Sequence, residues 1–513
     1  MDFSWYLSRI IELISAFFIL TAVALLIYSV IIYIKDSRQK KSTILRNYPL
    51  IGRFRFLFEK AGEFFRQYFF AMDREELPFN RAQRSWVYRA AKDLDSTIAF
   101  GSTKDLRQAG AIIFVNCPFP KLDHENAALG PIMIGPYCDQ PYSTSSVFNI
   151  SGMSFGAISK PAVQALSHGA KKAGCWYNTG EGGLSPYHLE GGCDIVYQIG
   201  TAKYGVRDEF GRLSDVKLKE IAKHQQVKMF EIKLSQGAKP GKGGILPGLK
   251  VTQEIANIRG IPAFVDSISP NRHAEVNSPA ELLDLIHHIR VVTGKPVGFK
   301  TVISSWDWLE ELCELIQSRG EESAPDFITI DGGDGGSGAA PMSLMDNVGL
   351  PLTEALPAVE NVLIEYGLRK RIRLIASGKR INPTEVAWAL CAGADFITSA
   401  RGFMFALGCI QALQCNKNTC PTGITTHDKE LQRGLDPTNK ADRVANYQKN
   451  LVKEISIIAH SCGVSGPRRL NRHHARIVMS NGLSTPLNEL QPYPDSYSGA
   501  HHSPSSNSTL DRN

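Results

Sequence analysis

The sequence lacks the features that mark a small secreted domain or a nucleic-acid-binding protein. Its ten cysteines are spread over 513 residues without the dense, even spacing of a disulfide scaffold. Its basic residues are scattered and form no long stripe interleaved with aromatics, although the formal net charge is +7. With 43% hydrophobic and 21% charged residues, the composition also excludes a wholly disordered chain. We therefore expect a globular protein in a reducing compartment that binds no nucleic acid.

Long apolar runs are absent from the sequence except near its beginning. Residues 16–34 read AFFILTAVALLIYSVIIYI, include no charged residue and are long enough to cross a membrane as one helix. They lack the short apolar core and small-residue cleavage site of a secretory signal. A basic cluster from Lys35 to Lys41 follows, which by the positive-inside rule places the rest of the chain in the cytoplasm. The sequence predicts a single-pass inner-membrane protein anchored by residues 1–41, with a buried core helix as the alternative.

Short apolar runs from Val147 onward predict an α/β protein with a (β/α)8 TIM barrel. Most of the runs are followed by a loop containing Gly, Pro or Asp and then by a helical segment. The eight runs are VFNIS, CWYNTGEG, MFEIKLS, AFVDSIS, VGFKTV, FITIDGG, IRLIASG and FITSA. Buried strands that alternate with helices are typical of parallel barrels, which take about 250 residues. We place the barrel at residues 146–430.

The regions on either side of the predicted barrel differ from it in composition. Residues 42–145 combine an aromatic-rich helical stretch, from Phe54 to Phe70, with an extended stretch rich in Pro, Cys and Gly, and we interpret them as an adaptor or cap. Residues 431–490 form a predicted C-terminal helical region. The last residues, 491–513, are small, polar and Pro-containing, which predicts a disordered tail.

The loops after the predicted strands carry glycine and polar residues where barrel enzymes hold their active sites. The second strand runs into Asn178 and GEGG, the third into QGAKPG and the sixth into DGGDGGSGAAP. Gly335 and Gly336 would let backbone N–H groups approach a phosphate closely. The seventh strand ends in Ser377 and Gly378, near the position where such barrels often bind a cofactor phosphate. For any single loop, a turn-forming role is the alternative.

Lys300 ends the fifth predicted strand, where a buried ammonium needs an anionic partner. A reduced flavin, which is negative at N1, is one such partner. An ion pair with Asp331 or Glu231 is the other, and the sequence leaves both open.

Three cysteines cluster after the last predicted strand, in GCIQALQCNKNTCPTG. Cys409, Cys415 and Cys420, with proline after the last, indicate iron–sulfur ligation. A zinc site would need a fourth ligand, and the nearest downstream histidine is His427. Three unrelated buried thiols are a further alternative.

Several of these motifs, taken in order, resemble the FMN-binding domain of glutamate synthase. They are SGMSFGAIS at 151–159, NTGEGG at 178–183, EIKLSQGAKPGKGG at 231–244, FK at 299–300, DGGSGA at 334–339 and the Cys-x5-Cys-x4-Cys run. The resemblance extends from about Phe148 to Thr426. It implies FMN at the C-terminal face of the barrel and a three-iron (3Fe-4S) cluster on Cys409, Cys415 and Cys420.

The resemblance also implies roles for individual residues. The residues that would contact FMN are Met153, Ser154, Asn178, Lys300, Asp334, Gly335, Gly336, Ser377 and Gly378. The residues that would face an oxo acid are Glu181, Gln236, Lys239 and Arg259. Glu181, Lys239 and Lys300 are the candidate catalytic residues. In the implied reaction, ammonia adds to 2-oxoglutarate to give an imine, and reduced FMN delivers hydride to make L-glutamate. Lys239 and Arg259 would bind the carboxylates of the oxo acid.

The sequence also departs from the family pattern. Ile245 stands where glutamate synthases usually carry a glutamine, Gly333 stands where they commonly have a histidine, and IASGK replaces ADGG. We recognise no glutamine-hydrolysing domain, β-helical domain or NADPH-binding domain in the sequence. We therefore expect ammonia or an amine as nitrogen source and a separate electron-donor protein, either ferredoxin-like or a reductase subunit. Two alternatives stay open: an oxidoreductase for another amine or amino acid, and a non-catalytic electron-transfer subunit of a membrane complex.

Overall fold

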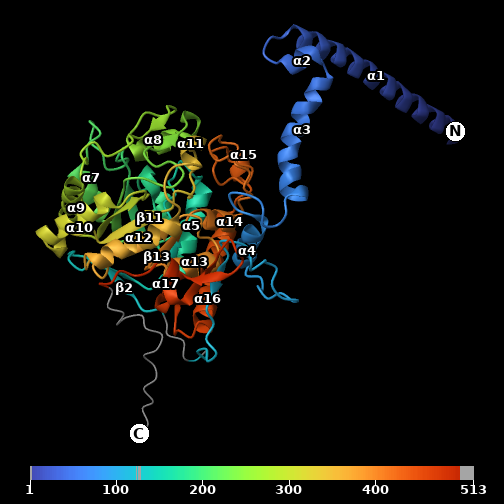
Figure 1. Cartoon of the computed structure of the whole chain (residues 1–513). Helices are drawn as coiled ribbons and strands as arrows, with labels where there is room; N and C mark the ends of the chain where they lie inside the picture. The colour runs from blue at the N-terminus through green and yellow to red at the C-terminus, as the bar shows by residue number, and fades with distance from the viewer. Residues whose placement is uncertain (1–2, 123, 125–128, 497–513) are drawn as a thin grey trace. The chain divides into compact units, whose positions relative to one another are not determined.

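A computed structural model of the chain describes residues 3–122, 124 and 129–496 (Figure 1). The chain divides into two compact units, Met1–Ala82 and Gln83–Asn513. Most of the predicted disordered tail, from residue 497 onward, lies outside the described residues.

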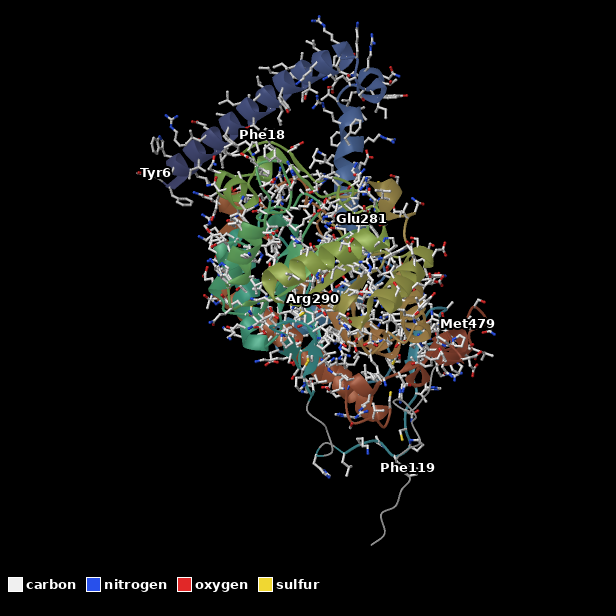
Figure 2. The ribbon with its side chains drawn as sticks, turned by 90° about the vertical axis from the view of Figure 1, so that its left-hand side faces the viewer. Tyr6, Phe18, Phe119, Glu281, Arg290 and Met479 are labelled. Carbon is white, nitrogen blue, oxygen red and sulfur yellow. The ribbon has the colours of Figure 1, made fainter. Side chains whose placement is uncertain are left out.

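The first unit begins with one long helix. Its elements are α1 (Phe3–Arg38), α2 (Thr43–Asn47), α3 (Ile51–Phe65) and the π-helix η1 (Arg66–Phe70). Side chains such as Tyr6 and Phe18 project outward from α1 into open space (Figure 2). Among the described residues, α1 is the one helix long and apolar enough to cross a membrane, a test that a signal sequence near an N-terminus also passes.

The second unit contains a closed barrel of eight parallel strands, as the sequence predicts. In barrel order the strands are β4 (Phe148–Ile150), β5 (Tyr177–Asn178), β6 (Ile195–Ile199), β7 (Val227–Lys233), β10 (Val297–Thr301), β11 (Phe327–Asp331), β12 (Arg373–Ser377) and β13 (Phe396–Ser399). Pairing of β13 with β4, with Ser399 opposite Ile150, closes the barrel. Most of the strand residues are buried on both faces, because side chains fill the interior and helices cover the outside.

One of the eight predicted strands is wrong, and one barrel strand was missed. The segment AFVDSIS lies outside the barrel, where Phe264 has a φ of +61° and is 73% exposed. Only Ser267–Ile268 of it forms a strand, β9, which pairs antiparallel with β8 (Ile245–Leu246). The true third strand is β6, so that MFEIKLS is the fourth.

Helices cover the outside of the barrel. They include α5 (Lys160–Ala173), α7 (Asp215–Ala222), α9 (Pro279–Thr293), α10 (Asp307–Arg319), α12 (Leu352–Glu365), α13 (Pro383–Cys391), α14 (Arg401–Leu407) and α16 (Pro437–Ser461). Several begin at side-chain caps. Ser159 accepts a hydrogen bond from the backbone N–H of Ala162, and Asn382 accepts one from that of Glu385. Short helices α4 (Arg81–Ala91), α6 (Pro186–Glu190), α8 (Gln253–Arg259), α11 (Met342–Met345), α15 (Lys429–Gln432) and α17 (Leu487–Leu490) lie between or beyond them.

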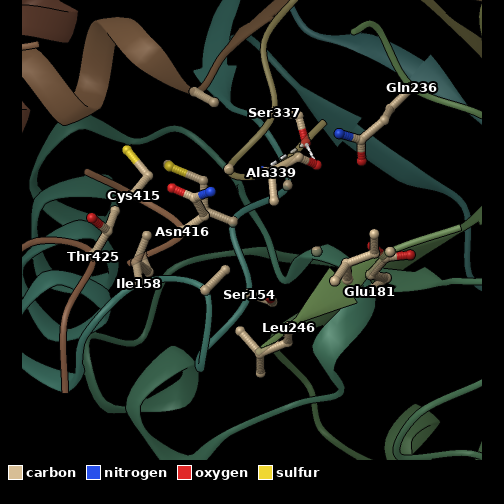
Figure 3. A pocket seen from close by; sticks show the side chains of 18 of the residues that line it. Ser154, Ile158, Glu181, Gln236, Leu246, Ser337, Ala339, Cys415, Asn416 and Thr425 are labelled. Carbon is tan, nitrogen blue, oxygen red and sulfur yellow. Dashed lines mark hydrogen bonds between the residues drawn. The ribbon is translucent and has the colours of Figure 1, made fainter. Parts of the chain in front are cut away.

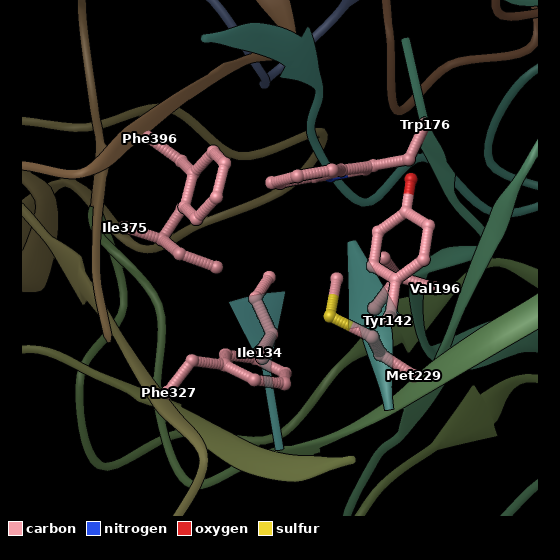
Figure 4. Packing of buried hydrophobic residues seen from close by; sticks show 8 residues of the cluster. All are labelled: Ile134, Tyr142, Trp176, Val196, Met229, Phe327, Ile375 and Phe396. Atoms are coloured by element: carbon pink, nitrogen blue, oxygen red, sulfur yellow. The ribbon is translucent and has the colours of Figure 1, made fainter. Parts of the chain in front are cut away.

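The predicted adaptor region supplies a hairpin that packs against the N-terminal end of the barrel. Its strands are β2 (Ile132–Ile134) and β3 (Tyr142–Thr144). Figure 4 shows its buried side chains packed among residues at the beginnings of the barrel strands. The cluster consists of Ile134, Tyr142, Trp176, Val196, Met229, Phe327, Ile375 and Phe396. With this end filled by apolar side chains, the opposite end is left for a functional site.

The adaptor and C-terminal regions also share a sheet. Strand β1 (Ile112–Phe114) pairs with β14 (Ala475–Val478), which pairs in turn with β15 (Ser484–Pro486). The segments on the two sides of the barrel are thus joined by backbone hydrogen bonds.

Candidate active site at the C-terminal end of the barrel

A cavity opens where the loops after the barrel strands converge. It is partly open to solvent, and the space free of atoms in the cavity and its mouth together is ≈ 1090 Å³. Figure 3 shows Glu181 and Gln236 on one side of it and Cys415 and Asn416 on the other. The predicted site residues that line it are Met153, Ser154, Glu181, Gln236, Lys239, Arg259, Lys300, Gly336 and Cys415.

Three of the residues predicted to contact FMN lie around the cavity rather than in its wall. Asn178 donates through Nδ2 to Glu231 Oε1 at 2.8 Å. Ser377 Oγ accepts a hydrogen bond from Lys300 Nζ at 3.4 Å. Gly378 follows with a φ of +106°, a backbone conformation that favours glycine. These residues form the layer below the cavity floor.

The glycine-rich loop after β11 forms one rim of the cavity. Gly335 N donates to Gly332 O at 2.8 Å, and Asp334 Oδ1 accepts from Leu352 N at 3.5 Å. Within this loop, Gly336 lines the cavity, whereas Asp334 and Gly335 hold the turn behind it.

A second loop, after β7, carries Gln236 and Lys239 and packs against the first. Gly237 N donates to Asp331 Oδ2 at 3.0 Å. A Cβ at Gly237 would come 2.8 Å from the Cα of Gly335, closer than real Cβ atoms approach other atoms. Glycine is required there because the two loops touch backbone to backbone, and this contact positions both cavity-lining side chains.

Lys300 forms a buried ion pair at the base of the cavity. Its Nζ lies 3.0 Å from Asp331 Oδ2, and both side chains are less than a tenth exposed. Burial lowers the pKa of Lys300, but the charges of Asp331 and Glu231 outweigh burial and raise the pKa above its usual range. This is the ion pair that the sequence left open as an alternative. Lys300 also lines the cavity, so a permanent positive charge faces it.

Glu181 is the one carboxylate among the described residues that line the cavity. It lies in η3 (Gly180–Gly182), and its Oε1 is 3.0 Å from the Nζ of Lys233 at the end of β7. Burial raises the pKa of Glu181, but the charges of Lys233 and Lys239 outweigh burial and lower the pKa. The cavity therefore holds Glu181 as a carboxylate.

Lys239 and Arg259 are buried cations in the cavity wall, each 4% exposed. In the described part of the chain, the salt bridges at the cavity use two other lysines, Lys233 and Lys300. Burial lowers the pKa of Lys239 to about 8 and lowers that of Arg259 as well. Because a buried cation is stable only when it is paired, these two side chains indicate an anionic ligand.

Arg259 is held in place by contacts that leave part of its guanidinium unsatisfied. The group stacks over the Tyr204 ring with its carbon 5.1 Å from the ring centre, and NH1 donates to Ser267 Oγ at 3.3 Å. NH2 lies 3.5 Å from Ser154 Oγ. Its buried Nε has no hydrogen-bond partner. Such a fork is suited to bind a carboxylate.

The cavity is also lined by three cations that were not predicted as site residues. They are Lys233, Lys250 and Arg401. Lys233 ends β7, and Lys300 is the last residue but one of β10, so the argument applied to Lys300 would also have found Lys233. Arg401 directly follows the predicted strand FITSA, so inspection of that loop would have found it, whereas Lys250 follows no barrel strand and reaches the cavity only through the tertiary fold.

Lys250 and Arg401 connect the cavity to the cysteine segment. Lys250 donates to Ala157 O at 2.7 Å and to Cys415 O at 3.3 Å. Arg401 donates to Ser337 O at 2.5 Å, and its NH1 lies 3.8 Å from Cys415 Sγ. Two positive charges thus lie beside the segment predicted to carry thiolates, which stabilises anionic sulfur.

The three clustered cysteines lie after α14 and are close enough to influence one another electrostatically. Burial raises the pKa of Cys409 to about 11. At Cys420, burial raises the pKa, but hydrogen bonds that include Thr422 Oγ1, 3.4 Å away, outweigh burial and lower it. The donor set of three thiols near cations fits a thiolate-ligated cluster.

Among the described residues, no three His, Cys, Asp or Glu side chains are arranged as a ready metal site. His427, the alternative zinc ligand, has its Nε2 2.8 Å from the backbone oxygen of Gly156. Burial lowers the pKa of His427 to about 4, so the ring is neutral. A hydrogen bond to that carbonyl uses one ring nitrogen as donor.

Comparison with known proteins identifies the family. A conserved region in glutamate synthase matches residues 120–465 of the chain. The glutamate synthase large subunit-like protein YerD of Bacillus subtilis (strain 168) is 41% identical over 482 residues, which cover 86% of this chain and 91% of that protein. The chain belongs to the glutamate synthase family. The matched region contains every cavity-lining residue, whereas helices α1 and α3 precede it.

A more distant relative in sequence agrees with this assignment. An archaeal-type glutamate synthase (NADPH) of Dehalococcoides mccartyi is 35% identical over 339 residues. These cover 65% of this chain and 63% of that relative, so the chain matches less than two thirds of its length. Among solved structures, mandelate oxidase with benzoyl-formic acid aligns with 77% of this chain and 98% of its own at 14% identity, with a TM-score of 0.44.

Proposed function

We propose that this member of the glutamate synthase family is an oxidoreductase that reductively aminates 2-oxoglutarate to L-glutamate. The observation that carries the proposal is the pair of buried cations, Lys239 and Arg259, which line the cavity and form no salt bridge with any other described residue. A dicarboxylate needs two fixed cations, and a guanidinium can bind one carboxylate through two parallel hydrogen bonds. Glu181 is the one carboxylate near them among the described cavity-lining residues, and the two carboxylates of the oxo acid would supply further negative charge.

The residues of the cavity have separable tasks in this proposal. Lys239 and Arg259 bind the two carboxylates and fix the orientation of the oxo acid. Glu181, kept ionised by Lys233, binds ammonium and holds its nitrogen beside the keto carbon. Gln236, on the same loop as Lys239, offers an amide to the keto oxygen.

The cavity also has the features that an FMN site needs. Glycines line the cavity, and Lys300 presents a fixed positive charge to it. Cys415 of the thiol segment lies on the side of the cavity opposite Glu181 and Gln236 (Figure 3). When bound, FMN would supply the hydride, and an iron–sulfur cluster on Cys409, Cys415 and Cys420 would pass electrons from a separate donor protein. Lys300 stabilises negative charge on whatever ring system occupies the floor.

A second candidate function uses the same cavity on another amine or amino acid. Ile245 lines the cavity at the position where glutamate synthases usually carry a glutamine, and it replaces an amide with an apolar wall. Such a wall favours a substrate with an apolar side chain over a second carboxylate. A non-catalytic electron-transfer subunit would need no such set of oriented cations, so we rank it below both.

We further propose that α1 anchors the protein in the inner membrane with the barrel in the cytoplasm. Its length and apolar composition allow it to span a bilayer, and the basic cluster follows its apolar stretch. An electron donor bound to the membrane or dissolved in the cytoplasm could then reach the barrel.

Purification followed by turnover tests the proposal. We expect the anaerobically purified protein to contain about one FMN and iron with acid-labile sulfide. The reduced protein should be reoxidised by 2-oxoglutarate with ammonium and should form L-glutamate. Reoxidation by other oxo acids alone would favour the second candidate, and no reoxidation by any oxo acid would contradict both.

A further inference from the structure

The segment from Ile51 to Phe70 has two unlike faces. Counted at 100° per residue, one face carries apolar side chains and the other carries charges. The apolar face consists of Ile51, Phe54, Leu57, Phe58, Ala61, Phe64, Phe65, Tyr68 and Phe69. The charged face consists of Arg53, Arg55, Glu59, Lys60, Glu63 and Arg66. The large side chains of the apolar face are exposed, and the large apolar residues on the charged side are Phe56 of α3 and Phe70 of η1.

A fixed turn starts this segment beside the end of α1. The carboxylate of Asp36, which is 1% exposed, accepts from Arg53 Nε at 2.7 Å and NH2 at 2.6 Å. It also accepts from the backbone N–H of Leu50 at 3.4 Å. Gln39 bridges the turn by donating to the backbone oxygens of Asp36 and Ser42. If α1 spans the membrane as proposed above, this turn begins α3 at the membrane surface.

From this turn, α3 extends away from the axis of α1 and does not double back along it (Figures 1 and 2). Six charged residues in twenty also exclude a second span, because each would have to enter hydrocarbon. A helix with one apolar and one charged face, rich in phenylalanine and arginine, instead lies in the plane of a membrane interface.

The charge of the region matches an anionic surface. Between residues 35 and 66 there are nine basic and three acidic residues. Anionic headgroups attract such a segment because its basic residues lie near the membrane surface.

From these contacts we infer that α3 and η1, residues 51–70, form an interfacial helix that binds an anionic lipid surface with its apolar face in the headgroup boundary. This inference rests on the proposed role of α1 as a membrane anchor. It extends membrane contact along the chain as far as Phe70, beyond the span itself.

Tryptophan substitutions in the full-length protein test the inference. Phe58→Trp places a probe on the apolar face, and Phe56→Trp is the matched control two positions earlier on the charged face. The proteins are reconstituted in phosphatidylcholine vesicles with or without phosphatidylglycerol, and the parent's emission is subtracted. For Phe58→Trp we expect a blue shift and loss of most of the added emission when the lipids carry bromine near the headgroup. We expect neither change for Phe56→Trp, and a stronger effect for Phe58→Trp on the anionic vesicles.

Flotation of the same vesicles separates the two proposals. If the parent protein does not float with the vesicles, the anchor role of α1 fails, and this inference fails with it. If it floats but Phe58→Trp is quenched no more than Phe56→Trp, the interfacial helix alone is overturned. Equal quenching on neutral and anionic vesicles would overturn the lipid charge preference. A blue shift without bromine quenching, which weakens as protein is diluted in lipid, would assign the face to a second copy of this chain instead.

Discussion

The surroundings of the Lys239 side chain are those expected of a residue that binds an anionic ligand. It is buried, has a lowered pKa and lines the cavity beside Glu181. We expect Lys239→Met to reduce kcat/KM for 2-oxoglutarate by about 10- to 100-fold, since a hydrogen bond to a charged group is worth roughly 1.5–3 kcal/mol. Flavin and cluster spectra should not change. Stopped-flow reoxidation measures the effect, with exposed Lys242→Met on the same loop as control. If the reoxidation kinetics of Lys239→Met are unchanged with every oxo acid, Lys239 does not bind the substrate.

The lowered pKa of Lys239 also predicts how binding depends on pH. The side-chain amine of Lys239 is protonated and positively charged below about pH 8, and it loses this proton as the pH rises through that value. The oxo acid stays a dianion over this range, so its affinity should be constant at lower pH and fall above about 8. Titration of the oxidised protein with 2-oxoglutarate at several pH values measures this. In Lys239→Met the step near pH 8 should disappear, and a step that persists would belong to another group.

Lys300 should behave differently, because it already has a partner. Lys300→Met leaves the carboxylate of Asp331 buried and unpaired, which should cost roughly 3–5 kcal/mol of folding free energy. The double variant Lys300→Met with Asp331→Asn removes both charges and should recover much of that stability. It should still have a lower flavin reduction potential than the parent, because the positive charge that Lys300 presents at the base of the cavity is gone. If the flavin reduction potential of the double variant equals that of the parent, Lys300 serves only as a structural ion pair.

The site residues were predictable from the sequence to the extent that they follow strands or lie in family motifs. Glu181, Gln236 and Lys239 come from loops distant in sequence, and the fold brings them to one cavity. Lys250 was not predictable in this way, whereas Arg401 directly follows the predicted strand FITSA and was overlooked. One lies in a short turn and the other begins a helix, and only tertiary packing places them beside Cys415.

At the scale of elements, the sequence predicted seven of the barrel strands and missed β6. Between β5 and β6 lie the 3-10 helix η3 and the five-residue helix α6, and both are too short to show a helical period. The wrong strand, AFVDSIS, has the apolar composition of a buried strand. Its apolar side chains are exposed at the surface, however, and composition does not reveal which face of the fold a segment reaches.

The contact between α5 and α16 gives a stability prediction. A Cβ at Gly169 would lie 2.5 Å from the Cβ of Val444, so the two helices touch at this glycine. Gly169→Ala should lower the free energy of unfolding by about 1–3 kcal/mol through overpacking, despite alanine's better helix propensity. Denaturant unfolding measures it. Val444→Gly removes the Cβ that the added methyl would meet, so the double variant should be more stable than the sum of the single changes predicts. Additive losses would contradict the contact.

The cysteine segment gives the second prediction at this scale. Cys415→Ser should lose iron while the barrel stays folded, because the segment follows the last strand and is no part of the barrel wall. Iron analysis and far-UV circular dichroism measure the two effects. Cys391→Ser, at a buried cysteine of α13, is the control and should retain iron. Zinc without iron after anaerobic purification would contradict the cluster.

At the scale of the whole molecule, the chain divides near Ala82, well after the predicted anchor ends at residue 41. The segment that follows the division belongs with the barrel. Asn450 Nδ2 donates to Ala90 O at 2.9 Å, and Trp86 packs edge-on against Tyr447, so α4 is bound to α16. A truncation should therefore preserve α4.

This division predicts that two truncations differ. Removing residues 1–41 deletes α1 but leaves the exposed aromatic side chains of α3 and η1 on the surface. Contiguous exposed apolar patches promote association, so that variant should aggregate or keep binding vesicles. Removing residues 1–70 also deletes this surface and keeps α4, so it should give a protein that is soluble without detergent and retains flavin and iron. Size-exclusion chromatography without detergent, with flavin and iron content measured on each peak, compares the two. Equal solubility of both truncations would show that α3 and η1 do not act as a membrane surface. A flavin-free product of the longer truncation, with full-length protein normal in detergent, would show that the barrel depends on the first unit.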